Sequence, residues 1–218
     1  MPFSKIKQSQ SLKHIAFEVI KNAIINHDIL PGEPLYERYL SEKLEISRTP
    51  VREALQLLEL EGWVTSVPRK GTFVSNISIA DVEEIFQVRR ALEILIVELL
   101  VPKITDEQLA ILEGILDMQV KMQDDKKTFI AIDKDFHAHL AQFTGNRRIV
   151  QLIETYGDQM SWFGYRAITQ SGRIEAALKE HEAIYEGLKA RNLERAKQAV
   201  VDHMEKTRLA ILSTIQSN

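Results

Sequence analysis

The sequence contains no cysteine. This absence excludes disulfide bonds, thiolate zinc sites and catalysis by a nucleophilic cysteine, and it fits the reducing cytoplasm. Long apolar runs are missing too, and none approaches the length of a membrane-spanning helix. The first residues, MPFSKIKQSQ, lack the apolar core of a secretory signal peptide. We therefore expect a soluble cytoplasmic protein with no membrane partner.

An excess of positive charge is also missing. The chain carries 28 Lys and Arg against 31 Asp and Glu, and residues 1–76 hold ten basic against nine acidic residues. A net charge of −3 argues against broad affinity for nucleic acid. Any DNA affinity must come from a local patch, which dimerisation would double. The candidate residues for this patch are Arg38, Arg48, Arg52, Arg69 and Lys70.

Strand patterns are scarce, and none follows Val74. The 218 residues suffice for two modest domains, each with its own core. The short polar segment 75–78 predicts a boundary between a first domain over residues 1–76 and a second over residues 77–218. Helical periodicity throughout the second domain predicts an all-α bundle of six or seven helices, so the chain is mainly α.

The most informative stretch is 44–62, LEISRTPVREALQLLELEG. Ser47 or Thr49 can cap a helix there, Pro50 suits its first turn, and Gly62 marks its end. The apolar stripe of this helix consists of Val51, Ala54, Leu55 and Leu58. The pattern predicts a short amphipathic helix with an exposed N-terminal end.

Arg48 and Arg52 lie one turn apart on the open side of this helix. Arginine can bond guanine O6 and N7 together, so both side chains suit reading of the major groove. By themselves, two such arginines are more simply explained as solvated charges. The flanks favour DNA reading, because a short helix over 37–44 precedes and a strand–turn–strand pattern over 63–74 follows. The basic turn of that hairpin can lay Lys70 along DNA phosphates.

Residues 31–74 resemble the winged-helix domain of the GntR family of bacterial transcription regulators. The runs SRTPVREAL, EGWV and PRKG fall at the family's spacing. The resemblance implies a winged helix-turn-helix of three helices and a small β-hairpin that binds double-stranded operator DNA. By position, the family's DNA contacts fall on Arg38, Ser47, Arg48, Thr49 and Arg52, with Gly71 at the tip of the wing.

Two further helices carry apolar stripes. The first helix of the chain, over residues 9–27, has Ser11 as a plausible cap. Its predicted buried face is Ile15, Val19, Ala23 and Ile24. The helix over residues 78–102 has a longer stripe, made of Ile85, Val88, Leu92, Leu95, Ile96 and Leu99. This longer stripe predicts either core packing or a dimer interface.

Two arginines, Arg89 and Arg90, interrupt the longer stripe. Pairing with Glu93 is the simpler explanation for them. The alternative is that Arg89 points inward and holds an anionic effector, in a pocket whose walls include Tyr165 and Arg166.

Four residues of the second domain have the chemistry of metal ligands. Asp133 and His137 stand one turn apart on a single helix, so they share a face. His181 lies about ten residues before the last interhelical turn and His203 about eleven after it, so they reach similar heights on antiparallel helices. Spacing alone leaves open that each histidine is an ordinary polar group of the core or the surface.

The segments AIDKDFHAHLAQFTGN and LKEHEAIYEGLKARNLERAKQAVVDHM resemble the FCD ligand-binding domain of FadR-type members of the GntR family. Many members bind a divalent metal at four positions, which correspond here to Asp133, His137, His181 and His203. The resemblance implies a zinc or nickel ion with one or two positions open for a small carboxylate effector. His139 points to the opposite face of its helix and is excluded as a ligand.

The leading interpretation is a regulator that binds a palindromic operator as a homodimer and changes its affinity when the effector binds. A metal-dependent hydrolase is the first alternative, but no general base of the HExxH kind stands beside the candidate ligands. We therefore expect no catalytic residues. A regulator whose metal is purely structural and a pure metal sensor are two further alternatives.

Overall fold

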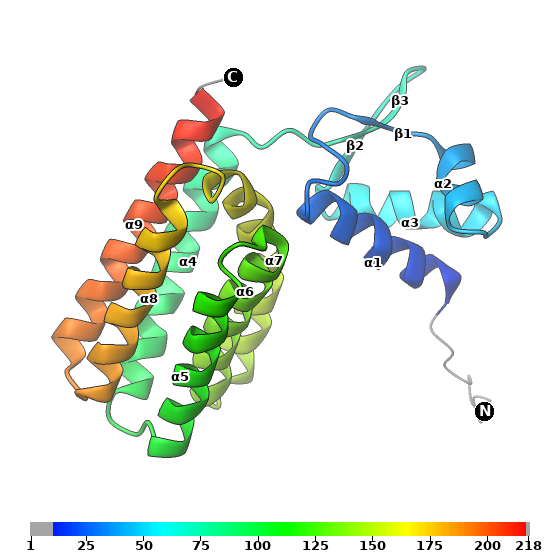
Figure 1. Cartoon of the computed structure of the whole chain (residues 1–218). Coiled ribbons are helices and arrows are strands. Elements are labelled where there is room, and N and C mark those ends of the chain that lie inside the picture. The colour runs from blue at the N-terminus through cyan, green and yellow to red at the C-terminus, as the bar shows by residue number, and fades with distance from the viewer. Residues whose placement is uncertain (1–10, 217–218) are drawn as a thin grey trace, which may run out of the picture. The chain divides into compact units, whose positions relative to one another are not determined.

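The computed structural model of the protein describes residues 11–216. The chain divides into two compact units that meet between Asn76 and Ile77 (Figure 1). Among the described residues, the first unit contains three helices and one small sheet, and the second unit is helical throughout. The predicted mainly helical fold class is confirmed.

The first unit is a winged helix-turn-helix, as predicted. Its described elements are α1 (Leu12–Ile25), β1 (Pro34–Leu35), α2 (Glu37–Lys43), α3 (Arg48–Leu60), β2 (Val64–Val67) and β3 (Gly71–Val74). The strands form one antiparallel sheet in the order β1-β3-β2, in which β2 and β3 make the predicted hairpin. The short strand β1, which pairs Pro34 with Phe73, is an addition that the sequence did not predict.

The core of this unit forms where α1 packs on α3. The predicted stripe of α3 is confirmed, since all four of its residues are at most 5% exposed. The predicted face of α1 is wrong in part, because Ile15 and Val19 are 45% and 47% exposed while Ala16, Phe17 and Ile20 are buried. Apolar residues cover adjacent faces of α1, so periodicity alone did not select the face that contacts α3.

Two predicted cap residues of the first unit occupy the right positions but make no capping bonds. Ser11 and Ser47 each precede their helix in an extended backbone conformation, and neither side chain bonds to the helix end. Residues 9 and 10 of the predicted first helix lie outside the described residues. At the wing, Gly71 has φ +116°, a conformation that strains any residue with a side chain.

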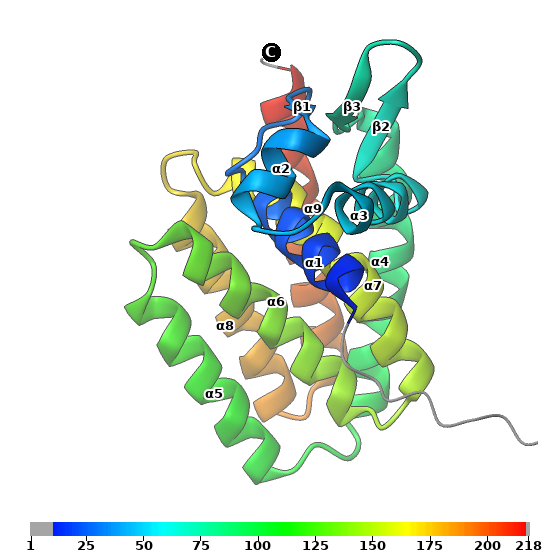
Figure 2. The same ribbon diagram turned by 90° about the vertical axis from the view of Figure 1, so that its right-hand side faces the viewer.

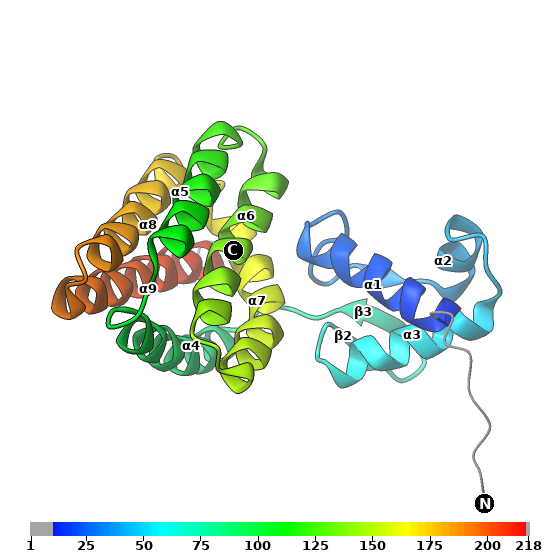
Figure 3. The same cartoon turned by 90° about the horizontal axis from the view of Figure 1, so that it is seen from below.

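The second unit is a bundle of six helices within the described residues, at the lower end of the prediction. They are α4 (Ile79–Leu100), α5 (Asp106–Lys121), α6 (Lys126–Phe143), α7 (Arg147–Ala167), α8 (Arg173–Lys189) and α9 (Leu193–Gln216). The helices form two layers, in which α4, α9 and α8 face α7, α6 and α5 (Figures 1 and 3). Capping boxes at Ser78 and Thr105 start α4 and α5.

Helices α8 and α9 form a tight antiparallel hairpin. A Cβ added at Gly187 would lie 2.7 Å from Cα of Ala196, so only glycine allows this approach of the two backbones. Arg191 completes the turn between the helices with φ +50°. This hairpin holds the middle of α8 and the middle of α9 at the same height.

The outer face of α4 is apolar. Of the predicted stripe, Ile96 is fully buried, but Val88 and Leu95 are 42% and 39% exposed. The face of α4 that enters the core instead consists of Val82, Phe86, Arg89, Glu93, Ile96, Val97 and Leu100. The prediction that the stripe packs in the core is therefore wrong for most of its residues, because the neighbouring face of α4 packs against the other helices of the bundle.

Candidate metal centre and nucleic-acid interface

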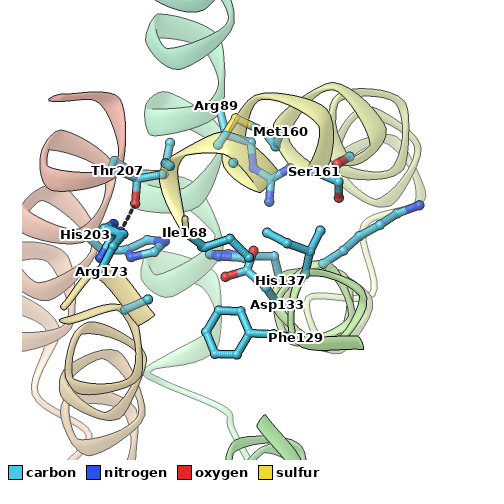
Figure 4. Close-up of a pocket in the computed structure, with 17 residues that line it drawn as sticks. Arg89, Phe129, Asp133, His137, Met160, Ser161, Ile168, Arg173, His203 and Thr207 are labelled. Carbon is cyan, nitrogen blue, oxygen red and sulfur yellow. Dashed lines mark hydrogen bonds between the residues drawn. The ribbon is translucent and has the colours of Figure 1, made fainter. Parts of the chain in front are cut away.

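Three helices bring the candidate metal ligands together. His137 of α6, His181 of α8 and His203 of α9 are all buried, and one ring nitrogen of each lies within 4.8 Å of the others. Asp133 stands one turn before His137, and its Oδ1 lies 3.3 Å from Nε2 of His181. Figure 4 shows Asp133, His137 and His203 turned towards one cavity. The four predicted residues thus form a single cluster.

Two of the three imidazoles have an outer hydrogen-bonding partner, and the third lies against a carboxylate. Nδ1 of His181 lies 2.9 Å from Oε1 of Gln119, and Nδ1 of His203 lies 2.9 Å from Oε2 of Glu180. Nδ1 of His137 lies 2.9 Å from Oε1 of Glu93, although not in hydrogen-bonding geometry. An acceptor beside Nδ1 favours the tautomer that leaves Nε2 without a proton.

The centre has a buried nitrogen that makes no hydrogen bond. Nε2 of His181 is shielded from solvent and bonds to no described residue, although Oδ1 of Asp133 lies 3.3 Å away. Such an orphaned acceptor is costly unless a ligand or ion satisfies it. Three imidazoles and one carboxylate are the donor set that zinc and similar divalent ions accept. The cluster therefore fits a divalent metal ion by its chemistry.

Burial sets the protonation of the cluster. Burial, together with the neighbouring histidines, lowers the pKa of His181 well below its usual value. Burial also lowers the pKa of His203, although the bond to Glu180 opposes this shift. Both rings are therefore neutral near pH 7, the form that binds a metal. Burial alone would raise the pKa of Glu93, but His137 and Arg89 outweigh it and hold that pKa at about 2.

Two buried arginines stand behind these glutamates. Nη2 of Arg89 lies 2.8 Å from Oε1 of Glu93, and Arg173 donates two hydrogen bonds of 3.1 and 3.0 Å to Glu180. Arg173 also donates to Oγ1 of Thr207 at 2.7 Å (Figure 4). Arg89 therefore pairs with Glu93, as the simpler explanation held, and at the same time it lines the cavity. An arginine–glutamate pair thus stands behind His137 and another behind His203.

The cavity beside the cluster is small, with a volume of about 40 Å³. One ordered water needs about 10–15 Å³ by this measure, so the space admits only a few non-hydrogen atoms. Its charged and metal-binding lining residues are Arg89, Asp133, Lys134, His137, Arg173 and His203. Tyr165 and Arg166 do not line it, so this prediction is wrong, and Arg166 instead donates to the carbonyl oxygen of Thr214.

Several residues of the centre were missed by sequence reasoning. Gln119 and Arg173 are buried polar residues of α5 and α8, and neither has a sequence signal of its own. Glu180 immediately precedes His181, and this Glu-His pair was the available clue. The excluded His139 makes its contacts outside the cluster, with the backbone oxygen and carboxylate of Asp135.

The seven residues predicted to contact DNA are all exposed on the first unit. Ser47, Arg48 and Thr49 lie at the N-terminal end of α3, and Arg52 follows on the next turn. The other three are Arg38 on α2, and Lys70 and Gly71 at the tip of the β2–β3 hairpin, which projects beyond α3 (Figure 2). The acidic neighbours of two of these arginines were not predicted, since Arg38 bonds to Glu42 and Arg52 to Glu37.

The sequence of this chain matches known protein families and individual relatives. Residues 13–74 match the bacterial regulatory proteins of the gntR family, and residues 84–206 match the FCD domain. YdhC, an HTH-type transcriptional regulator of Bacillus subtilis strain 168, is 34% identical over 190 residues, which span 86% of this chain and 85% of YdhC. The HTH-type transcriptional repressor RspR of Escherichia coli K12 is 26% identical over 220 residues, which span 99% of this chain and 95% of RspR.

Solved structures with the same fold include E. coli McbR/YncC, with a TM-score of 0.80, 22% identity and coverage of 96% of this chain and 100% of the other. A GntR transcriptional regulator from Rhodococcus sp. RHA1 has a TM-score of 0.79 at 26% identity, and the match covers 92% of this chain and 97% of the other. The matched gntR family and the relatives YdhC and RspR are regulators of transcription rather than enzymes. Among the described residues, no helix combines the length and apolar character needed to span a membrane.

Proposed function

The chain belongs to the GntR family of bacterial transcriptional regulators and carries an FCD domain, and on this basis we propose that it binds a palindromic operator as a homodimer and responds to a small carboxylate beside a metal ion. One observation carries the proposal. Three buried imidazoles and a carboxylate form one cluster, and Asp133, His137 and His203 of this cluster line a cavity together with two buried arginines. This arrangement suits the sensing of an anion.

The DNA-binding part of the proposal rests on the exposed start of α3. Arg48 and Arg52 project there without covering the apolar stripe, so they are available to base edges in a major groove. Lys70 at the tip of the wing is suited to a phosphate contact. Because the unit is barely basic, two copies on two half-sites would be needed for tight and specific binding.

The dimer part of the proposal rests on the outer face of α4. Its stripe of Ile85, Val88, Leu92, Leu95 and Leu99 follows a heptad spacing and stays at least partly exposed. On the adjacent helix α7, Leu152 is 41% exposed as well. A continuous apolar face of this kind is unfavourable in water and typical of a surface that pairs with its own copy.

The metal part of the proposal assigns Asp133, His137, His181 and His203 as the residues that hold a divalent ion, with zinc or nickel preferred by imidazole ligands. Such an ion would supply an open coordination position for an oxygen of the effector. Glu93, Gln119 and Glu180 would orient the rings as outer partners.

The charge balance of the buried centre supports a singly charged effector. Asp133, Glu93 and Glu180 contribute three negative charges, and Arg89 and Arg173 contribute two positive charges. The charge of Lys134 is balanced by its partner Asp158, so the protein groups sum to −1 with neutral histidines. A divalent ion would bring the sum to +1. Because uncompensated buried charge is costly, a small monocarboxylate would complete the balance. The small cavity also favours an acid of few atoms.

A structural metal is the one alternative that a specific observation favours. The three histidines lie on three different helices, so an ion bound by them would cross-link α6, α8 and α9. Such an ion would stabilise the fold whether or not an effector exists.

Thermal unfolding against a panel of small carboxylates, with and without a chelator, tests the sensing function. A ligand present at 100 times its Kd adds about 2.7 kcal/mol to the stability of the folded state. We expect one monocarboxylate to raise the midpoint of the wild type and of His139→Ala, but not of His203→Ala or of chelated protein. A midpoint that falls with the chelator and responds to no acid would identify a structural metal. No response to either reagent would refute the metal centre.

A further inference from the structure

Arg52, on the second turn of α3, is held by an acidic residue of the preceding helix. Its Nε donates to Oε1 of Glu37 at 2.8 Å, and its Nη2 donates to Oε2 at 2.7 Å. Both oxygens of the carboxylate are used, and the two residues come from α3 and α2. A two-bond contact of this kind fixes the plane of the guanidinium as well as its position.

The bonds to Glu37 occupy one edge of the guanidinium and leave the other edge available. Arginine has five N–H donors, and Glu37 accepts from Nε and from one hydrogen of Nη2. The remaining outer edge, formed by Nη1 and Nη2, is the edge that can bond O6 and N7 of guanine together. The Arg52 side chain is 61% exposed, so this edge is accessible to DNA.

We propose that Glu37 is a specificity-determining residue, which holds Arg52 in the orientation that reads a guanine in the operator. The inference rests on the DNA-binding function proposed above. A carboxylate at the DNA-facing surface repels phosphates and so lowers affinity for every sequence. An orienting role gives Glu37 a benefit that offsets this loss, because specificity depends on the difference between correct and incorrect sites.

The other acidic neighbour at this surface offers a comparison. Arg38 donates from Nε to Oε1 of Glu42 at 2.9 Å, within a single helix and with both side chains largely exposed. Exposed pairs of this kind contribute little and are readily broken. The Glu37–Arg52 pair instead links two helices, and the hydrogen bond from Arg52 is the main cause that lowers the pKa of Glu37. Glu37 therefore remains an anionic acceptor near pH 7.

In vitro selection of operator duplexes from a random pool, with full-length protein, tests the inference. The variants are Glu37→Gln, Arg52→Ala and the matched control Glu42→Gln. We expect Arg52→Ala to lose the preference for guanine at one position of each half-site, Glu37→Gln to lose it at the same position, and Glu42→Gln to keep it. On the wild-type site, Glu37→Gln should bind about tenfold more weakly, within the range of one arginine–guanine contact.

A second readout separates orientation from simple structural damage. Replacing the contacted guanine by 7-deazaguanine removes N7, which should weaken wild-type binding by roughly tenfold and leave Glu37→Gln nearly unaffected. Glu37→Asp, whose shorter side chain cannot span both bonds, should behave like Glu37→Gln. Thermal unfolding midpoints equal to that of the wild type would show that the variants are folded.

Two results would overturn the inference. Selection of the wild-type site by both Glu37→Gln and Glu37→Asp would show that Arg52 needs no orienting partner. If Glu37→Gln binds selected and random duplexes more tightly than the wild type does, and by the same factor for both, the carboxylate only competes with DNA for Arg52. If the wild type itself selects no site, the proposed DNA-binding function is wrong and the inference falls with it.

Discussion

Replacement of Glu180 by glutamine tests the link between the buried arginine pairs and the metal centre. Glu180 is 6% exposed, accepts two hydrogen bonds from Arg173 and faces Nδ1 of His203. The substitution preserves shape and removes charge. It therefore weakens the outer partner of one proposed metal ligand, and it deprives a buried arginine of its counter-ion.

The two effects have separate magnitudes. Loss of an outer partner of a metal ligand lowers metal affinity by about 10–100-fold. That loss corresponds to roughly 1.4–2.7 kcal/mol. Because Arg173 is only 9% exposed, its unpaired charge should destabilise the metal-free protein by about 3–5 kcal/mol. For a protein of this size, that change lowers the unfolding midpoint by on the order of 10 °C.

Two measurements check this reasoning. Competition with a chromogenic chelator gives the metal affinity, and calorimetry gives the midpoint of the metal-free protein. Glu186→Gln is the control, since Glu186 lies 3.9 Å from Arg195 on an exposed part of the same helix and should change stability by less than about 0.5 kcal/mol. A Glu180→Gln protein with wild-type metal affinity and midpoint would refute the proposed role of the arginine–glutamate pair.

Three further predictions concern the fold, its pH dependence and its assembly. Gly187→Ala should lower the free energy of unfolding by about 1–3 kcal/mol, because its Cβ would collide with the α9 backbone, whereas Gly114→Ala, with open space around it, should not destabilise in the same melts. Burial would raise the pKa of Glu93, but His137 and Arg89 hold it at about 2, so its contribution to stability is full above about pH 4.5 and is lost as the pH falls towards 2. Acid titration of metal-free protein should accordingly show a shallower loss of stability for Glu93→Gln than for the wild type, and equal slopes would contradict this account. Leu95→Glu on the outer face of α4 should give a folded monomer of 25.0 kDa in sedimentation, while Met118→Glu, similarly exposed on α5, should leave the proposed dimer intact.

Local signals in the sequence identified nearly every helix. The capping boxes at Ser78 and Thr105 and the turn at Gly145 mark helix ends by chemistry that acts within a few residues. The same holds for the apolar stripe of α3, where polar residues surround a single apolar face. Such features are determined by near neighbours along the chain, so they can be read without the fold.

Faces and partners required the tertiary structure. Helix α1 has apolar residues on adjacent faces, and only its contact with α3 decides that Phe17 is buried and Val19 exposed. In α4, the face that carries Arg89 is buried in the bundle, and Leu95 stays exposed. Periodicity restricts the possible faces, whereas the packing of neighbouring helices selects among them.

The sequence by itself indicated four candidate metal ligands, because their spacing allows them to meet and the resemblance to the FCD domain places metal ligands at the same four positions. Only the tertiary structure decided their surroundings, including the outer acceptors Gln119 and Glu180 and the cavity beside them. It alone also joined Glu37 to Arg52 across two helices. These contacts link residues far apart in the chain, and their distances depend on how separate helices pack rather than on any local spacing.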